Sequence, residues 1–162
     1  MRSAYEFQPN LGSIPIKRIK IDLRSRDDIP AILLGLQLIW CDPEKQEKLF
    51  ALLDGHIGPV PHRPAGRPGM DMWRILVLAV LRCGIGCDFD RLQELANQHR
   101  TVRKMLGHGD DRVDGYQYSR QTVSANVALL PPELLHEVKI LVESTGHAVA
   151  KKRAWRRVGR PG

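Results

Sequence analysis

The spacing of hydrophobic and polar positions predicts a chain built almost entirely of helices. Two acidic residues and a proline within positions 27–30 are typical of a helix start, and apolar residues then follow at helical spacing. Asp42-Pro43 repeats the start signal for a second helix, which is expected to end near Gly55. The pattern therefore predicts a helical hairpin over residues 27–55. Its apolar positions are Ile32, Leu33, Leu36, Ile39 or Trp40, Leu49, Leu52 and Leu53.

The segment 71–107 predicts three further helices. Residues 72–82 are apolar on nearly every side, which is typical of a buried central helix. Gly84 and Gly86 are expected to end that helix, because glycine readily adopts the left-handed conformation of a helix C-terminus. Asp88 is the expected N-cap of a short helix, and after a break a final turn or two closes the segment.

The segment 119–150 predicts two more helices that share the same core. Ser119 is the expected N-cap of a helix over 120–130, and Pro131-Pro132 opens the last one, whose expected inner face is Leu134, Leu135, Val138, Leu141 and Val142. The predicted fold class is all-α, a small helical bundle with helix-turn-helix-like elements and a short extended N-terminal segment. The positions expected to be buried are Trp73, Leu76, Val80, Leu92, Leu95, Leu130 and Leu135.

Stretches without helical periodicity set the expected boundaries. An extended lead is predicted at the N-terminal end, where Pro15 argues against a central strand. A Pro/Gly-rich stretch after the hairpin is predicted to be a linker, and a basic tail is predicted to be disordered because its cations repel one another. The expected units are the lead 1–26, hairpin 27–55, linker 56–70, helical domain 71–150 and tail 151–162.

The net charge of +7 suggests an anionic partner, but the charge is concentrated at one end. Residues 151–162 hold six Lys/Arg and no acid, which leaves 19 basic and 18 acidic residues in positions 1–150. The longest apolar run is seven residues, Ile75 to Leu81, whereas a transmembrane helix needs roughly 18 or more. Residues 1–10 lack the apolar region of a secretory signal, so we expect a cytoplasmic protein without membrane contact.

Metal-dependent chemistry has little support in the sequence. Cys83 and Cys87 have a spacing found in metal sites, but a zinc site needs about four ligands, and His99 and His108 are the nearest candidates, so we expect buried free thiols. A two-metal nuclease needs about three converging carboxylates, usually at strand ends of a mixed α/β core. The clustered acids Asp110, Asp111 and Asp114 lie in a polar loop with no β-rich segment around them.

Residue types on the predicted helices are compatible with nucleic-acid binding. Cationic side chains on the predicted solvent side of the helices could contact phosphates, and the 120–130 helix presents arginine and glutamine, which make bidentate contacts with bases. Composition alone favours an ordinary solvated helix face. Gly66-Arg67-Pro68-Gly69 also has the core of an AT-hook arm, or is simply a turn-prone tetrapeptide. The candidate DNA contacts are Arg67, Arg91, Arg100, Arg103, Lys104, Arg120, Gln121 and Ser124.

The order of landmarks from Gly66 to Gly107 resembles the InsH-type N-terminal domain of bacterial insertion-sequence transposases. The shared features are a Gly-Arg-Pro opening, an Asp, an apolar helix, a short helix with Leu and Glu at 92–95, and a basic turn ending in Leu-Gly. The lead at 29–37 and the segment from Ser119 to Leu135 are similar to one branch, the not-yet-classified (ISNCY-like) group. The resemblance covers about residues 7–150.

In that family this domain precedes an RNase-H-like catalytic domain of the DDE class, which would be expected to use Mg²⁺. The family's first catalytic Asp would be expected shortly beyond Lys152, and nothing in this sequence matches it. No catalytic residue is therefore carried over, and the chain as it stands is expected to be neither an enzyme nor bound to a cofactor. Under this resemblance a premature stop, a frameshift or a fragment would be expected to account for the early end, and a frameshift for the Arg-rich residues 151–162.

The resemblance implies the DNA-binding N-terminal part of a transposase, which acts in DNA transposition and recombination. Its expected partners are DNA and, further, a second copy or a full-length transposase. The alternative is an oligomerisation or regulatory module that associates with the full-length enzyme and makes no base contacts. The nearly neutral charge of residues 1–150 favours this alternative.

Overall fold

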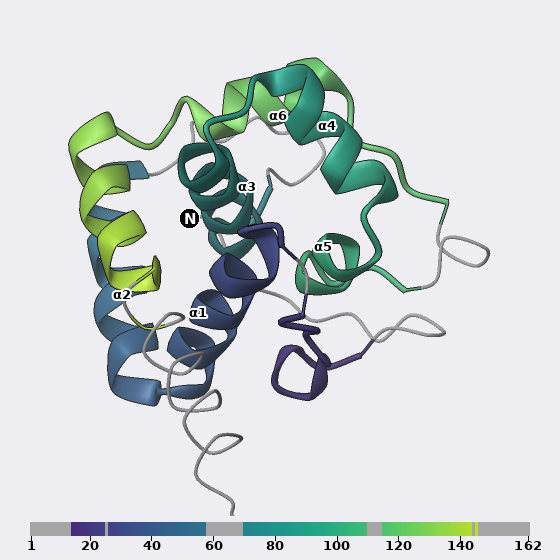
Figure 1. Cartoon of the computed structure of the whole chain (residues 1–162). Coiled ribbons are helices and arrows are strands. Elements are labelled where there is room, and N and C mark those ends of the chain that lie inside the picture. The colour runs from purple at the N-terminus through teal and green to yellow at the C-terminus, as the bar shows by residue number, and fades with distance from the viewer. Residues whose placement is uncertain (1–13, 25, 58–69, 110–114, 144, 146–162) are drawn as a thin grey trace, which may run out of the picture.

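Every regular element that the structure describes is helical. The computed structural model describes residues 14–24, 26–57, 70–109, 115–143 and 145, and the predicted all-α class is confirmed for these residues (Figure 1). No helix among them is long and apolar enough to cross a membrane. In chain order the elements are the 3₁₀ helix η1 (Ile16–Arg18), α1 (Ile29–Cys41), α2 (Pro43–Ile57), α3 (Met72–Ile85), α4 (Phe89–Gln98), α5 (Arg100–Met105), α6 (Arg120–Val127) and a last helix over residues 132–143.

Several sequence predictions concern residues outside this description. They include residues 1–13 of the lead, 58–69 of the linker, the loop carboxylates at 110–114 and the tail 151–162. The first two residues of the predicted linker belong to α2, which continues past Gly55 to Ile57.

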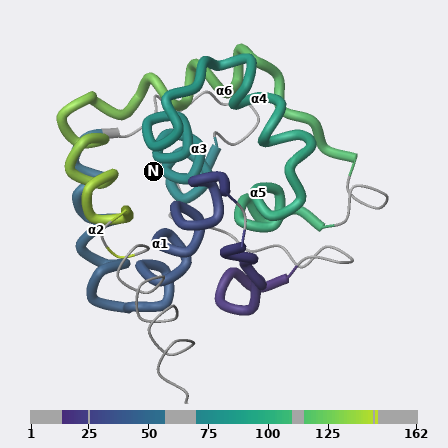
Figure 2. Tube along the Cα trace, viewed as in Figure 1, coloured from purple at the N-terminus to yellow at the C-terminus, as the bar shows by residue number. Residues whose placement is uncertain are grey.

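Helix α3 lies at the centre of the fold (Figures 1 and 2). Its residues from Met72 to Leu81 are buried except Arg74, as the apolar pattern predicted. The Asp71 carboxylate accepts a hydrogen bond from the Arg74 amide, and Gly86 closes the helix with a left-handed φ of 65°. Gly84 does not end the helix as expected. It lies inside it, where an added Cβ would be 2.5 Å from Cδ1 of Ile32 on α1.

Helix α1 is buried almost as completely as α3. Six consecutive residues, 32–37, are buried, because α1 packs against η1, α2 and α3 together. A side chain at Gly35 would overlap the backbone oxygen of Val142, so α1 and the last helix also approach closely. The hydrophobic core joins residues of the predicted hairpin to those of the 71–150 segment, and it also includes Ile16 of η1 and the next residue after that turn, Ile19.

The lead is not simply extended. Ile16–Arg18 forms a 3₁₀ turn after Pro15, whose carbonyl accepts a hydrogen bond from the Arg18 amide. The cause is tertiary, since the buried side chain of Gln37 donates to the carbonyls of both Ile16 and Ile19 at 2.8 Å. One amide group therefore holds the turn on α1 and satisfies two backbone acceptors.

The last helix presents a narrower face to the core than the one expected. Leu134, Val138 and Val142 are buried, and Leu130 precedes them in the same core. Leu135 is only half-buried, which corrects its place among the buried residues, and Leu141 is exposed. An apolar residue one position away from a helical stripe lies about 100° around the helix, so the core covers one stripe and leaves its neighbour at the surface.

The two glycines of α1 and α2 supply the first prediction. Gly35→Ala should destabilise the protein by about 1–3 kcal/mol, because the new methyl group must displace the backbone at Val142. Gly55→Ala is the matched control, since its Cβ would meet nothing within 4 Å, and it should stabilise α2 by about 0.5–1 kcal/mol. Chemical denaturation of both variants measures the difference. Equal effects of the two substitutions would contradict the close packing of α1.

Candidate nucleic-acid interface

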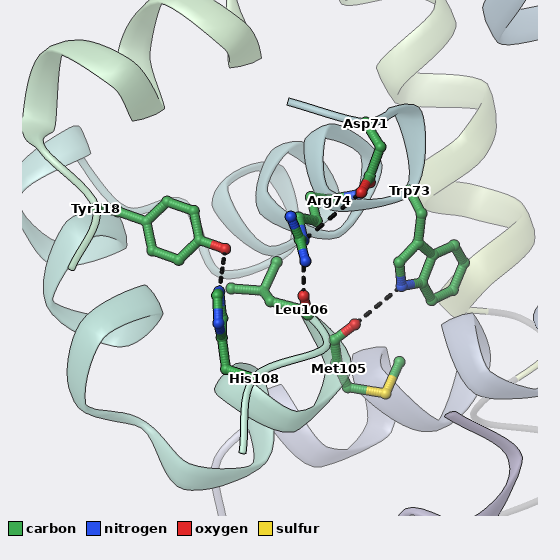
Figure 3. Close-up of polar contacts among 7 residues, drawn as sticks. All are labelled: Asp71, Trp73, Arg74, Met105, Leu106, His108 and Tyr118. Carbon is green, nitrogen blue, oxygen red and sulfur yellow. Dashed lines mark hydrogen bonds and ion pairs between the residues drawn. The ribbon is translucent and has the colours of Figure 1, made fainter. Parts of the chain in front are cut away.

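Two side chains of α3 hold the C-terminal end of α5 (Figure 3). Trp73 Nε1 donates to the Met105 carbonyl at 2.9 Å, and Arg74 Nε donates to the Leu106 carbonyl at 2.8 Å. The last carbonyls of a helix have no partners within the helix, and here they are buried, so these donors remove a cost that the fold would otherwise carry. The Asp71 carboxylate lies 3.6 Å from Arg74 Nε and helps to orient the guanidinium.

The break between α4 and α5 is made by His99, which ends one helix and caps the next. Its Nδ1 accepts a hydrogen bond from the Val102 amide at 3.3 Å. Burial lowers the pKa of His99, and the nearby Asp27 carboxylate opposes this shift. A lowered pKa favours the neutral imidazole, which is the form that can accept the capping hydrogen bond.

Helix α4 fixes the loop that leads into α6. Gln93 Nε2 and Asn97 Nδ2 each donate to the Tyr118 carbonyl at 3.0 Å, and the Tyr118 amide donates to Asn97 Oδ1 at 2.7 Å. Ser119 follows directly, and its hydroxyl accepts from the Thr122 amide at 3.1 Å as the N-cap of α6. Hydrogen bonds from α4 to the backbone of Tyr118 thus fix the position at which α6 begins.

An aromatic cluster completes the support beneath the loop. Tyr118 is buried, its hydroxyl oxygen lies 2.5 Å from His108 Nε2, and the two rings meet edge to face (Figure 3). Burial raises the pKa of Tyr118, so the phenol stays protonated. The exposed ring of Tyr116 stacks on His108. Together these contacts join the end of α5 to the beginning of α6.

Helix α6 buries one face and presents the other. Val123 and Val127 are buried where α6 packs against α3 and α4. The outer face combines two polar residues at the N-terminal end with small side chains further along. Arg120, Gln121, Ala125 and Ala128 are exposed, and Ser124 is half-buried with its hydroxyl donating to the Gln121 carbonyl at 3.2 Å.

The structure distributes the predicted cationic contacts unevenly. Arg120 Nε lies 2.6 Å from Asp90, and Arg91 lies 2.9 Å from Glu94, so both exposed cations have acidic partners on α4. Arg100 is exposed at the start of α5, and Lys104 is half-buried. Arg67 lies outside the described residues.

Arg103 does not lie on the solvent side, which corrects the prediction. Only 3% of it is exposed, and its Nη1 donates to the carbonyls of Ala96, Asn97 and Tyr116 at 3.0–3.4 Å. These acceptors come from the end of α4 and from the loop before α6. The residue therefore connects three segments of the backbone and presents no charge to DNA.

Sequence reasoning missed the residues that hold this region together, namely Arg74, Gln93, Asn97, His108 and Tyr118. Each satisfies a polar group that is distant along the chain, and no short motif indicates such a pair. The three cysteines are free thiols as expected, but Cys41 is exposed and Cys83 and Cys87 are half-buried. Within the described ranges, no group of His, Cys, Asp and Glu is arranged to hold a metal ion.

Compared with models of known protein families, with curated proteins and with solved structures, the chain shows no match. The observations that bear on function are therefore the geometry of the described residues and the order of sequence landmarks from Gly66 to Gly107.

The position of Arg103 supplies a second prediction. Arg103→Ala should lower the free energy of unfolding by about 1–3 kcal/mol, because the buried carbonyl of Ala96 and the partly buried carbonyls of Asn97 and Tyr116 lose a charged donor. Arg100→Ala, three residues away and exposed, is the control and should change it by no more than about 0.5 kcal/mol. Urea denaturation of the full chain measures both. An Arg103→Ala protein as stable as the control would contradict the buried, hydrogen-bonded position of Arg103.

Proposed function

We propose that this chain is a DNA-binding module, in which α6 contacts bases, and that it is the N-terminal part of a transposase. The observation that carries the proposal is the outer face of α6, with Arg120 and Gln121 at its N-terminal end and small side chains after them. Arginine makes bidentate hydrogen bonds with guanine, and glutamine makes them with adenine. Recognition helices use their N-terminal residues for such contacts in the major groove.

The small residues on the same face also support the proposal. Ala125 and Ala128 are exposed and carry a single methyl group each, and Ser124 between the polar end and Ala128 is nearly as small. A helix face without long side chains lets the backbone approach the floor of a groove. The Ser119 cap on α6 and the contacts from α4 to the Tyr118 carbonyl hold the start of this helix in place.

The ion pairs at Arg120 and Arg91 do not prevent binding. Both arginines are at least half exposed, and exposed pairs of this kind contribute only about 0.2–1 kcal/mol. A DNA phosphate or a base edge can replace the carboxylate of Asp90 or Glu94 as the partner. Asp90 and Glu94 do reduce the non-specific attraction of this surface for DNA. We therefore assign sequence-independent binding of phosphates to the six cations of residues 151–162.

A third prediction separates base-specific DNA binding from non-specific DNA binding. The full chain is incubated with a pool of random duplexes, and the bound sequences are selected and read. We expect an enriched motif, because α6 contacts bases. Arg120→Ala and Gln121→Ala should change or abolish the motif, whereas Lys17→Ala, on the exposed turn of η1, should leave it intact.

Replacing the six Lys/Arg of residues 151–162 by glutamine should preserve the motif and weaken binding to every duplex. The slope of log affinity against log salt should fall by up to about 5, since each phosphate contact contributes about 0.9. Loss of the motif in the glutamine variant, together with an unchanged motif in the α6 variants, would rule out α6 as the reading element.

The second candidate is an interaction module without base contacts, which assembles with full-length transposase. The pairing of Arg91 and Arg120 with acids of α4 favours it, because these pairs leave little net positive charge around α6. Under this candidate, the random pool yields no motif, and the chain co-sediments with the transposase it resembles.

We also propose that the chain does not cleave DNA, because its sequence lacks the carboxylate pattern of a two-metal nuclease. A fourth prediction is that purified protein with Mg²⁺ or Mn²⁺ neither nicks nor joins supercoiled and linear DNA. The matched variant Asp110→Asn/Asp111→Asn should be indistinguishable from wild type. Metal-dependent nicking that this double variant loses would overturn the proposal.

A further inference from the structure

A groove separates α2 from the helix over residues 132–143. It has a volume of about 310 Å³, and its lining is mainly aliphatic. Leu49 and Leu52 of α2 and Val138 and Leu141 of the last helix form its apolar part, while Lys45, Lys48 and Glu137 complete the lining. Helix α2 packs against α1, and the last helix approaches α1 at Gly35, so both helices lie against α1 with this space between them.

The groove carries apolar residues that the fold does not cover. Leu52 and Leu141 are each 40% exposed, and Ile140 beside Leu141 is 54% exposed. Scattered exposed leucines are ordinary, but these two belong to one concave surface on two different helices. A contiguous apolar surface rimmed by charges is typical of an interaction site.

The charges of the groove lie toward opposite ends. Helix α2 and the last helix run in opposite directions (Figure 1), so the first turn of α2 lies beside the end of the last helix. Lys45 and Lys48 therefore lie toward one end, and Glu137 lies toward the other, with the leucines between them. Glu133, one helical turn before Glu137 and exposed, adds a second negative charge on the same side of the helix.

A two-fold axis through the middle of such a groove exchanges its ends. We propose that the groove binds the same groove of a second copy of this chain. The lysines of one copy then face Glu137 of the other, twice, and the leucines of both copies are removed from water between them. Isologous interfaces require a surface of this self-complementary kind. The proposal does not depend on DNA binding by α6.

Charge reversal tests the proposal with the full chain in the absence of DNA. Wild type should sediment as a dimer in equilibrium with monomer. Glu137→Lys alone and Lys45→Glu/Lys48→Glu alone each place like charges opposite one another in a homodimer. Each should weaken dimerisation at least about tenfold.

Mixing the two variants is the decisive measurement. In a mixed dimer every lysine again faces a glutamate, at both contacts, so the mixture should associate as wild type does while each component alone does not. A charge effect within one chain would not produce this rescue. Glu47→Lys is the matched control, because Glu47 is exposed on α2 but does not line the groove, and it should dimerise normally.

Two outcomes would overturn the proposal. The first is a wild-type chain that stays monomeric over the accessible concentration range; if Leu52→Ser then also lowers the melting temperature, a segment of the same chain covers the groove. The second is a mixture of the charge variants that associates no better than its components. Leu52→Ser and Leu141→Ser should otherwise weaken the dimer and leave the melting temperature of the monomer nearly unchanged, because both side chains are exposed.

Discussion

The fold depends on the way α3 satisfies the buried end of α5. Helix α3 is apolar on almost every face, so the surrounding helices must cover it and bring their own backbone ends into the interior. The carbonyls of Met105 and Leu106 are such an end, and Trp73 and Arg74 donate to them. Since an unsatisfied buried carbonyl costs about 1–3 kcal/mol, each of the two donors stabilises the end of α5 at this place.

The position of α6 follows from that contact through a short series of others. With α5 fixed, His108 meets Tyr118, and Arg103 reaches from α5 to the loop carbonyl of Tyr116. Asn97 and Gln93 of α4 hold the same loop from the other side. The proposed reading helix is therefore supported by polar contacts from α4 and α5 and by apolar packing on α3. A helix held in this way is pre-organised for base recognition, because its backbone does not have to be ordered when it binds.

Helix starts were predicted best where the signal is local. The expected caps at Asp88 and Ser119 lie three residues from the amides they bind, so residue type and spacing were enough to predict them. At the start of α1, by contrast, the side chain of Asp28 makes no capping hydrogen bond. Residue type and spacing could not predict the positions of Gly84 and Arg103. Glycine ends helices by its own conformation, but Gly84 is required inside one by Ile32 of α1. Arginine is usually exposed, but Arg103 is buried because three carbonyls converge on it from segments that meet only in the folded chain.

Helix α6 and the groove between α2 and the last helix are different surfaces of the molecule, and their arrangement constrains the DNA that a dimer could bind. Helix α6 lies at the top of Figure 1, and the two helices whose residues line the groove, α2 and the last helix, lie at its left. A dimer formed through the groove would leave both copies of α6 uncovered and related by a two-fold axis. Two such helices can bind one duplex only if the DNA offers two half-sites with the same symmetry. Selection of an inverted repeat would thus indicate a chain that both contacts bases and dimerises. Selection of a single asymmetric motif would indicate a chain that contacts bases as a monomer. Dimers that select no motif would indicate the interaction module without base contacts.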